Sequence, residues 1–262
     1  MKRYIFLILI AGGMLSSCQK MSYFQVNPNT PSQSPPSLIL TYLCEQTFQE
    51  DPAVAGRACR YVTYYEVPDI YVQYNWAQGS FGDYDELRQV AQMEKEATRT
   101  NEPVYLSLAK FFKAYYYTNL SNTFGDVPFS ESMLASQGNI QPRYDDQEVI
   151  IDSCLQLLDQ ANNELAEDKG TIDGDIIFNG NILQWRQMIN AFRLRVLISL
   201  SKKVQEGSTK INVINQFKQI ISDPSQYPLM NGIQDNGQFV FHDLDGNRYP
   251  DYNYRSMQTL FS

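Results

Sequence analysis

The sequence predicts a mostly α-helical protein, made of helical pairs joined by irregular loops. In several segments the apolar residues recur every three or four positions, which places them on one face of a helix. Glycine, proline and asparagine separate these segments, and the connections between them differ in length. The run from Phe239 to Phe241 has the composition of a short strand. We therefore expect one helical domain over residues 37–262, to which strands contribute little.

Residues 1–17 have the pattern of a secretory signal peptide. Positively charged Lys2 and Arg3 precede an apolar run from Tyr4 to Met14. This run is shorter than the roughly 20 apolar residues that a membrane-spanning helix needs. Small residues follow, and the Leu-Ser-Ser-Cys ending at Cys18 resembles the lipobox of bacterial lipoproteins. The resemblance implies cleavage before Cys18 and acylation, for example with palmitate, whereas an ordinary secretory signal is the alternative.

Residues 18–36 are predicted to form a lipidated N-terminus and an extended tether. They are polar and rich in proline, asparagine and serine, a composition typical of an extended arm. Ser37 is predicted to cap the first helix, and a second helix is expected from Ala53 to Tyr65. The stretch 67–83 contains proline and glycine and is expected to form a loop, after which helical periodicity returns at Tyr84.

The strongest helical pattern runs from Pro103 to about Asn119. Proline suits the first turn of a helix, and one face carries Tyr105, Leu108, Ala109, Phe112, Tyr116 and Asn119. The next helix is predicted to begin with a capping box in the sequence from Asp145 to Glu148. Its apolar stripe comprises Ile150, Cys154, Leu157, Leu158, Ala161 and Leu165.

Two further helices are predicted in the last third of the chain. The first spans Ile182 to Lys203, and its apolar side carries Trp185, Met188, Ile189, Phe192, Val196 and Ser199. The second, from Ile211 to Ile221, ends before a proline. Helical periodicity is lost from Tyr227 onward, and the apolar ending at Ser262 leads us to expect a chain truncated at its C-terminus.

Charge and residue usage argue against several classes of function. The formal net charge of −8 becomes −10 when Lys2 and Arg3 are removed, which argues against nucleic acid as a partner. His242 is the sole histidine and no Cys-x-x-Cys pair exists, so neither a metal site nor a cofactor is expected. Cys44 and Cys59 are able to pair in an oxidising compartment, whereas Cys154 is predicted to be a buried free thiol.

The loop at residues 67–83 is the candidate ligand-binding site. Sugar recognition combines flat aromatic faces, which stack on the C–H-rich face of a pyranose, with planar polar groups that bond its hydroxyls. The loop offers both kinds of side chain within one short stretch: Tyr71, Tyr74, Asn75, Trp76, Gln78 and Phe81. The alternative is that Trp76 fills the core beneath the loop.

Two carboxylate pairs are the candidates for an acid–base pair of a glycoside hydrolase. They are Asp145 with Asp146 and Asp173 with Asp175. Neighbouring acids on helix caps and loops are mostly structural. A hydrolase is therefore the weakest of the alternatives, and we expect no catalytic residues.

Three segments together resemble the SusD/RagB family, outer-membrane glycan-binding lipoproteins of the Bacteroidetes, and in particular its SusD-like branch. The first runs from Ala109 to Tyr117 and continues into the Gly-Asp-Val-Pro sequence at 125–128. The second extends from Asn179 through Trp185 to Arg195. The third comprises Asn27 to Asn29 with Pro35 to Leu38. Family members are considerably longer, so the chain is expected to correspond to their N-terminal half.

The resemblance implies a fold, a function and a partner. The fold would have tetratricopeptide-like helical pairs on one side and irregular, ligand-facing loops on the other. The protein would bind glycans or other nutrient oligomers without catalysis and deliver them to a SusC-like TonB-dependent transporter. Its expected location is the outer membrane, lipid-anchored and at the cell surface, although residues 19–22 lack the acidic signal typical of surface export. A tetratricopeptide-like scaffold that binds protein and no sugar is the alternative.

Overall fold

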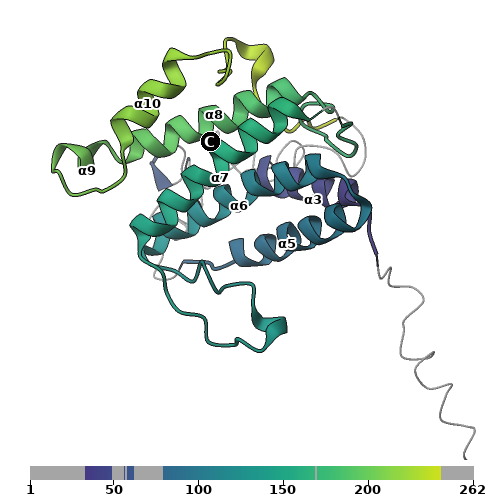
Figure 1. Ribbon diagram of the computed structural model, residues 1–262, viewed down its shortest axis with the longest axis horizontal. Helices are drawn as coiled ribbons and strands as arrows, with labels where there is room; N and C mark the ends of the chain where they lie inside the picture. The colour runs from purple at the N-terminus through teal and green to yellow at the C-terminus, as the bar shows by residue number, and fades with distance from the viewer. Residues whose placement is uncertain (1–32, 49–55, 57, 62–78, 169, 243–262) are drawn as a thin grey trace, which may run out of the picture. The chain divides into compact units, whose positions relative to one another are not determined.

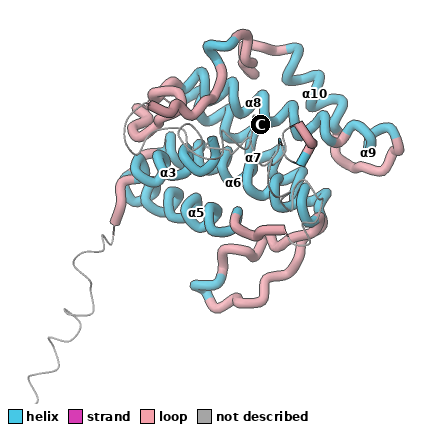
Figure 2. The backbone as a smooth tube through the Cα atoms, turned by 180° about the vertical axis from the view of Figure 1, so that it is seen from behind, coloured by secondary structure: helices cyan, strands magenta, loops and turns pink. Residues whose placement is uncertain are grey.

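A computed structural model describes residues 33–48, 56, 58–61, 79–168 and 170–242. Regular structure in these ranges is helical (Figures 1 and 2), apart from an isolated antiparallel bridge between Val127 and Asp145. The elements are α3 (Pro36–Phe48), α5 (Asp83–Thr100), α6 (Pro103–Phe124), η2 (Ala135–Gln137), α7 (Gln147–Glu167), α8 (Ile182–Ser199), α9 (Ser201–Gln205), α10 (Val213–Ser222) and η3 (Ile233–Asp235). The prediction of a mostly α-helical fold is confirmed.

Helices that follow one another in the chain pack side by side. The helices α5 and α6 form one pair, α7 and α8 form a second, and the contact between α6 and α7 joins the two pairs (Figure 1). At the short α5–α6 connection, Asn101 adopts a left-handed conformation with φ of 58° and its N–H bonds to carbonyls at the end of α5. Pro103 then opens α6, where a missing N–H costs nothing. Helix α3 packs on α5 and α6, and α10 packs on α8.

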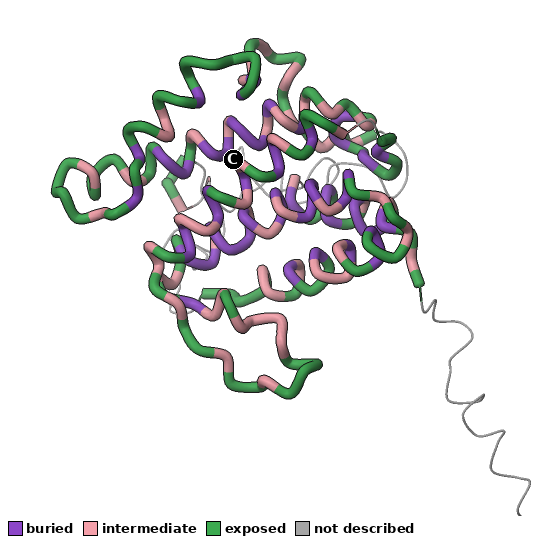
Figure 3. Tube along the Cα trace, in the orientation of Figure 1, coloured by how far each residue is buried: buried purple, intermediate pink, exposed green. Residues whose placement is uncertain are grey.

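Helix α6 lies at the centre of this packing. Its predicted apolar face is buried, except that Asn119 is half-buried. Buried residues also occur on its other sides, among them Phe111, Ala114, Tyr117 and Leu120 (Figure 3). Because α3, α5 and α7 all contact α6, apolar residues are needed on more than one side of α6. The predicted face was therefore correct but too narrow.

Trp185, in the first turn of α8, is the hub of the core. Its side chain is fully buried, and four phenylalanine rings surround it with centroids 5.2 to 6.3 Å away: Phe48, Phe111, Phe112 and Phe178. Their steep interplanar angles of 67° to 81° place ring edges against ring faces, the arrangement that the aromatic quadrupole favours. The indole N–H of Trp185 donates to Oδ2 of Asp175 over 2.8 Å.

The carboxylate of Asp175 organises the acidic loop before α8. Besides the indole it accepts the backbone N–H groups of Ile177, Phe178 and Gly180, over 2.9, 3.0 and 2.8 Å. A buried carboxylate with four donors has its lost hydration replaced. The loop also clasps α3, because a Cβ at Gly174, where φ is 77°, would lie 2.1 Å from a backbone oxygen of α3.

Several predicted helix ends are corrected by the structure. Pro36 opens the first helix, so Ser37 lies within the helix and does not cap it. The expected helix to Tyr65 is interrupted by a turn at 59–61, where Arg60 has φ of 59°. The helix expected to reach Lys203 breaks at Leu200, and α9 continues the chain as a separate short helix. Local sequence patterns fix the presence of a helix better than its ends.

Two other local predictions were wrong. The run from Phe239 to Phe241 forms no strand; instead its two phenylalanine rings contact each other at a centroid distance of 4.9 Å. The predicted capping box from Asp145 to Glu148 does not form, since the Asp145 carboxylate accepts N–H groups of Phe129 and Ser130 and Asp146, at the N-cap, bonds no N–H group with its side chain. Glu148 instead accepts the hydroxyl of Thr209 over 2.8 Å and a neighbouring backbone N–H. At Glu148 a tertiary contact thus replaces the local one that the sequence pattern predicts.

The cysteines within the described ranges are free thiols. Cys44 and Cys154 are buried, and Cys59 is exposed, so the disulfide considered between Cys44 and Cys59 is not formed. The prediction for Cys154 is confirmed, and burial raises the pKa of its thiol to about 12. Among the described helices, none is both long enough and apolar enough to cross a membrane.

Candidate functional site

The structure reaches one end of the predicted ligand-binding loop. Phe81 is described, whereas Tyr71, Tyr74, Asn75, Trp76 and Gln78 lie outside the described residues, as does Cys18. Phe81 lies just before α5 and is 50% exposed. The site that the structure allows us to build is therefore the aromatic corner around Phe81, which we define as Phe81, Tyr84 and Phe124.

Phe81 stacks on Phe124, the last residue of α6. The two rings are nearly parallel, with an interplanar angle of 8° and a centroid distance of 4.2 Å. A face-to-face contact of this kind fixes the plane of the Phe81 ring while half of the residue stays open to solvent. Phe81 is thus a flat, half-exposed apolar surface at the end of the predicted loop.

Gly79 allows the chain to pass close to the same phenylalanine. A Cβ at this position would lie 2.6 Å from Cζ of Phe124, closer than van der Waals contact permits. Glycine has no side chain, so the backbone is able to approach the ring. Phe124 is therefore contacted by Gly79 and by Phe81, and any larger residue at 79 has to displace it.

Tyr84 ties the corner to the loop between α6 and α7. Its hydroxyl donates to the carbonyl oxygen of Pro128 over 2.7 Å, and its ring meets Tyr117 edge-on at 6.3 Å. Desolvation, followed by the neighbouring Tyr117, raises the pKa of Tyr84 above its ordinary value. The hydroxyl thus stays protonated and keeps its role as a donor at any physiological pH.

The Gly-Asp-Val-Pro sequence connects the end of α6 to the start of α7. Gly125 adopts φ of 80°, which favours glycine, and lets the chain leave α6. Asp126 then accepts the backbone N–H of Gln147 over 2.9 Å, and the Gln147 side chain donates to the carbonyl of Ser121 over 2.7 Å. Asp126 therefore satisfies a free N–H at the start of α7 from a position outside that helix.

Asp145 holds the same loop at its other end. Its carboxylate accepts the N–H groups of Phe129 and Ser130, over 3.1 and 2.7 Å, and the hydroxyl of Ser130. Although desolvation opposes the effect, these hydrogen bonds and the guanidinium of Arg143 keep the pKa of Asp145 below its ordinary value. The loop is thus pinned at both ends, near Phe124 and near the start of α7.

Of the four carboxylates considered for acid–base chemistry, those of Asp145 and Asp175 have structural contacts. Asp145 and Asp175 are engaged with backbone N–H groups as described above, and these bonds account for their positions. Within the described ranges, no group of three histidine, cysteine or acidic side chains is arranged to hold a metal ion.

Sequence reasoning missed two members of the corner. The sequence indicates Phe124 as the end of a helix, before the Gly-Asp-Val-Pro motif, and Tyr84 as the return of helical periodicity; neither was among the predicted ligand-binding residues. The available signal was the position of Phe124 immediately before Gly125, where a helix end leaves an aromatic ring partly uncovered. The stacking partner of Phe81 lies 43 residues further along the chain, and no local pattern indicates such a pair.

A family model matches most of the chain. The model of the SusD-like family described as "starch-binding associating with outer membrane" matches residues 24–261. No curated protein matches the chain.

Solved structures share the fold. A SusD homologue from Bacteroides fragilis has 43% identity and a TM-score of 0.75, over 84% of this chain and 47% of that chain. An outer-membrane protein from Bacteroides vulgatus, to which a nutrient-binding role is ascribed, has 38% identity and a TM-score of 0.74, over 84% and 47%. A second SusD homologue from B. fragilis has 28% identity and a TM-score of 0.71, over 79% and 44%. The chain thus spans about half the length of these structures, and it shares their tetratricopeptide-like helical fold.

Proposed function

Because the chain belongs to the SusD-like family of starch-binding proteins that associate with the outer membrane, we propose that it binds oligosaccharides or other nutrient oligomers without catalysis. In this proposal the protein is a lipoprotein anchored through Cys18 at the cell surface. It delivers its ligand to a SusC-like TonB-dependent transporter. The binding surface is the loop at residues 67–83 together with the aromatic corner.

The observation that carries this proposal is the half-exposed ring of Phe81, held flat by Phe124. A pyranose presents C–H groups on one face, and an aromatic ring whose plane is fixed loses little freedom when a sugar stacks on it. Phe81 follows directly after the segment that contains Trp76, Asn75 and Gln78. Aromatic surface and planar hydrogen-bonding groups are therefore close together along the chain.

Titration of the mature chain with a glycan panel that includes starch-derived oligosaccharides tests the proposal. We expect Phe81→Ala and Trp76→Ala each to weaken binding by about 3- to 10-fold, the worth of one aromatic contact. Tyr144→Ala is the matched control, because Tyr144 is an exposed aromatic residue outside the aromatic corner. Absence of glycan binding in the wild type, or equal affinity of both variants and wild type, contradicts the proposal.

The anchor and the transporter are tested separately. We expect labelled palmitate to be incorporated into the wild-type protein and not into Cys18→Ala, and the variant to leave the membrane fraction. Copurification with a TonB-dependent transporter, from cells that express both, tests the delivery step. An unlipidated wild type contradicts the anchor without affecting the glycan-binding proposal.

A protein-binding scaffold is the second candidate function. Exposed apolar side chains on the outer side of α10, namely Ile214 and Ile221, together with Ile198 on α8, favour it. If these side chains form one contiguous apolar patch, such a patch is typical of a protein contact. The two candidates differ in one measurable respect, since a scaffold of this kind has no affinity for any glycan in the panel.

A further inference from the structure

A concave surface lies between α5 and the loop that joins α6 to α7. This cleft has a volume of about 700 Å³, within the range of roughly 300–1,000 Å³ that is usual for ligand sites. The loop, which carries η2, runs beside α5 (Figure 1). The α5 wall consists of Tyr84, Asp85, Arg88, Ala91, Gln92 and Lys95, and the loop wall of Pro128, Ser132, Met133, Ala135, Ser136 and Pro142.

The α5 wall carries two cationic side chains. Arg88 pairs with Asp85 over 2.7 Å, but the two side chains are 70% and 69% exposed, so the pair is weak and open to exchange. Lys95 is exposed and pairs with no carboxylate among the described residues. Arg88 and Lys95 are seven positions apart, about 10 Å along the helix axis and on the same side. Together with the carboxylate of Asp85, the wall therefore has a net positive charge of one, in a chain whose net charge is −8.

The loop wall is apolar and carries two hydroxyl groups. Pro128, Pro142 and Met133 supply apolar surface, and the flexible thioether of methionine adapts to side chains of different shape. Ser132 and Ser136 add hydroxyl groups at the same wall. An occupant of the cleft thus meets apolar surface on the loop side and positive charge on the helix side.

The loop wall is held in place by its own hydrogen bonds. The hydroxyl of Ser132 bonds to that of Tyr117 and to the carbonyl of Phe129. Glu131 accepts the side chain of Asn139 over 3.0 Å and the N–H of Arg143 over 3.2 Å. A wall fixed before binding reduces the entropy that an occupant has to supply.

We propose that this cleft binds a short extended peptide in which an acidic side chain lies next to an apolar one. The acidic group is recognised by Arg88 and Lys95, and the apolar side chain packs against Met133 and Pro128. From Asp85 to Lys95 the helix rises about 15 Å, the length of four or five residues of extended peptide. This site borders the aromatic corner, with which it shares Tyr84, but Arg88, Lys95, Met133 and Pro128, which recognise the peptide, lie outside that corner.

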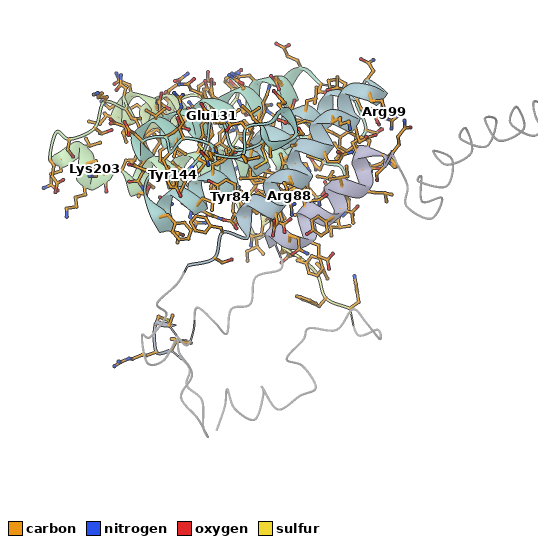
Figure 4. The ribbon with its side chains drawn as sticks, turned by 90° about the horizontal axis from the view of Figure 1, so that it is seen from below. Tyr84, Arg88, Arg99, Glu131, Tyr144 and Lys203 are labelled. Atoms are coloured by element: carbon orange, nitrogen blue, oxygen red, sulfur yellow. The ribbon has the colours of Figure 1, made fainter. Side chains whose placement is uncertain are left out.

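The aromatic content of the cleft favours a peptide over a sugar. Tyr84 is the one aromatic residue among those that line it. Its hydroxyl is bonded to Pro128 and its ring rests against Tyr117, so it does not offer the free, flat face that a pyranose requires. Figure 4 shows Tyr84 and Arg88 on neighbouring turns of α5.

The test uses the whole chain and two fluorescent pentapeptides. One peptide alternates leucine with glutamate, and the other has glutamine in place of each glutamate. We expect the glutamate peptide to bind at least about 5-fold more tightly, and the preference to shrink as salt is raised. The double variant R88Q/K95Q should weaken binding of this peptide by roughly 3- to 10-fold. K203Q, on exposed α9, is the matched control and should bind as the wild type does.

A second variant tests the apolar part of the site. Ala135 is exposed on η2 and lines the cleft, so A135W places a large side chain in its mouth without disturbing the core. We expect A135W to abolish binding of the glutamate peptide and to leave glycan affinity unchanged. Equal affinity for both peptides, unchanged binding in A135W and R88Q/K95Q, or displacement of the peptide by a neutral oligosaccharide would overturn the proposal.

Discussion

Trp185 and Phe81 are both large aromatic residues next to glycine-bearing loops, but the structure uses them in opposite ways. Trp185 is enclosed by four phenylalanine rings, and its one polar atom is bonded to Asp175. Phe81 stacks on Phe124 at 4.2 Å and more distantly on Tyr84 at 6.2 Å, and it stays 50% exposed. The first residue stabilises the fold, whereas the second is available to a ligand.

The difference shows that the coverage of a ring, and not its chemical type, separates a core residue from one with a face open to solvent. Full burial of a large apolar side chain stabilises a protein by about 1.5–3 kcal/mol, and that gain requires every face to be covered. An exposed face contributes little to stability, but a ligand is able to pack on it and displace the water there. Substitutions in the two regions should therefore separate loss of stability from loss of binding.

Asp175→Ala is expected to have the largest effect. Four donors lose their acceptor in a buried place, and we expect the free energy of unfolding to fall by about 3–5 kcal/mol. Urea denaturation followed by circular dichroism measures this change. Asp173→Ala is the matched control, because Asp173 is exposed in the same loop and should change stability by less than about 0.5 kcal/mol. Equal losses of unfolding free energy in the two variants would show that the four hydrogen bonds of Asp175 do not stabilise the fold.

Asp145 lies in the loop between α6 and α7, outside the core, but several hydrogen bonds hold its carboxylate in place. Since its pKa in the folded protein is lowered, its contribution to stability is present above the ordinary value of 3.8 and is lost as pH falls through the lowered folded value. We expect Asp145→Asn to cost about 1–2 kcal/mol at pH 7 and to flatten the dependence of stability on pH below 4.

Unfolding titrations at several pH values, with Asp146→Asn beside Asp145→Asn, check this prediction. Asp146 is exposed and its side chain caps no N–H group, so its variant should keep the pH dependence of the wild type. If the stability of Asp145→Asn depends on pH as that of the wild type does, other carboxylates are responsible for the loss of stability at low pH.

Phe81→Ala should have the smallest effect on stability. Half of the residue already contacts water, so we expect the free energy of unfolding to change by less than about 1 kcal/mol. The same variant is expected to bind glycan more weakly. Asp175→Ala, measured at a temperature low enough for the protein to stay folded, should keep the glycan affinity of the wild type. Thermal unfolding and glycan titration on the same samples test both halves. A large loss of stability in Phe81→Ala would assign Phe81 to the core.

The sequence was informative where a signal is local and periodic. The stripe through Trp185 and the buried thiol of Cys154 followed from helical spacing. Cys154 is buried, as are Trp185, Ile189, Phe192 and Val196 of the stripe, whereas Met188 is half-buried and Ser199 is exposed. The resemblance to the SusD-like family, carried by short motifs in order along the chain, is confirmed by the family match over residues 24–261. The ligand-binding role of Trp76 and its neighbours stays a prediction.

The sequence was uninformative where the partner is distant. Glu148 was expected to cap its own helix, but it bonds to Thr209, 61 residues away. The start of α7 is capped by Asp126, which lies 21 residues before Gln147. The partner of Phe81 is equally remote. Such contacts depend on how helices meet in three dimensions, which no local spacing encodes.

The bonds of Asp175 also make the core observable from outside. The amide protons of Ile177, Phe178 and Gly180 all depend on one carboxylate that is itself held by the indole of Trp185. These amides exchange with deuterium when the loop opens, and the loop cannot open without releasing the indole. The exchange rates of these three amides thus report whether the core is intact, and hydrogen-exchange mass spectrometry measures them in a single short fragment.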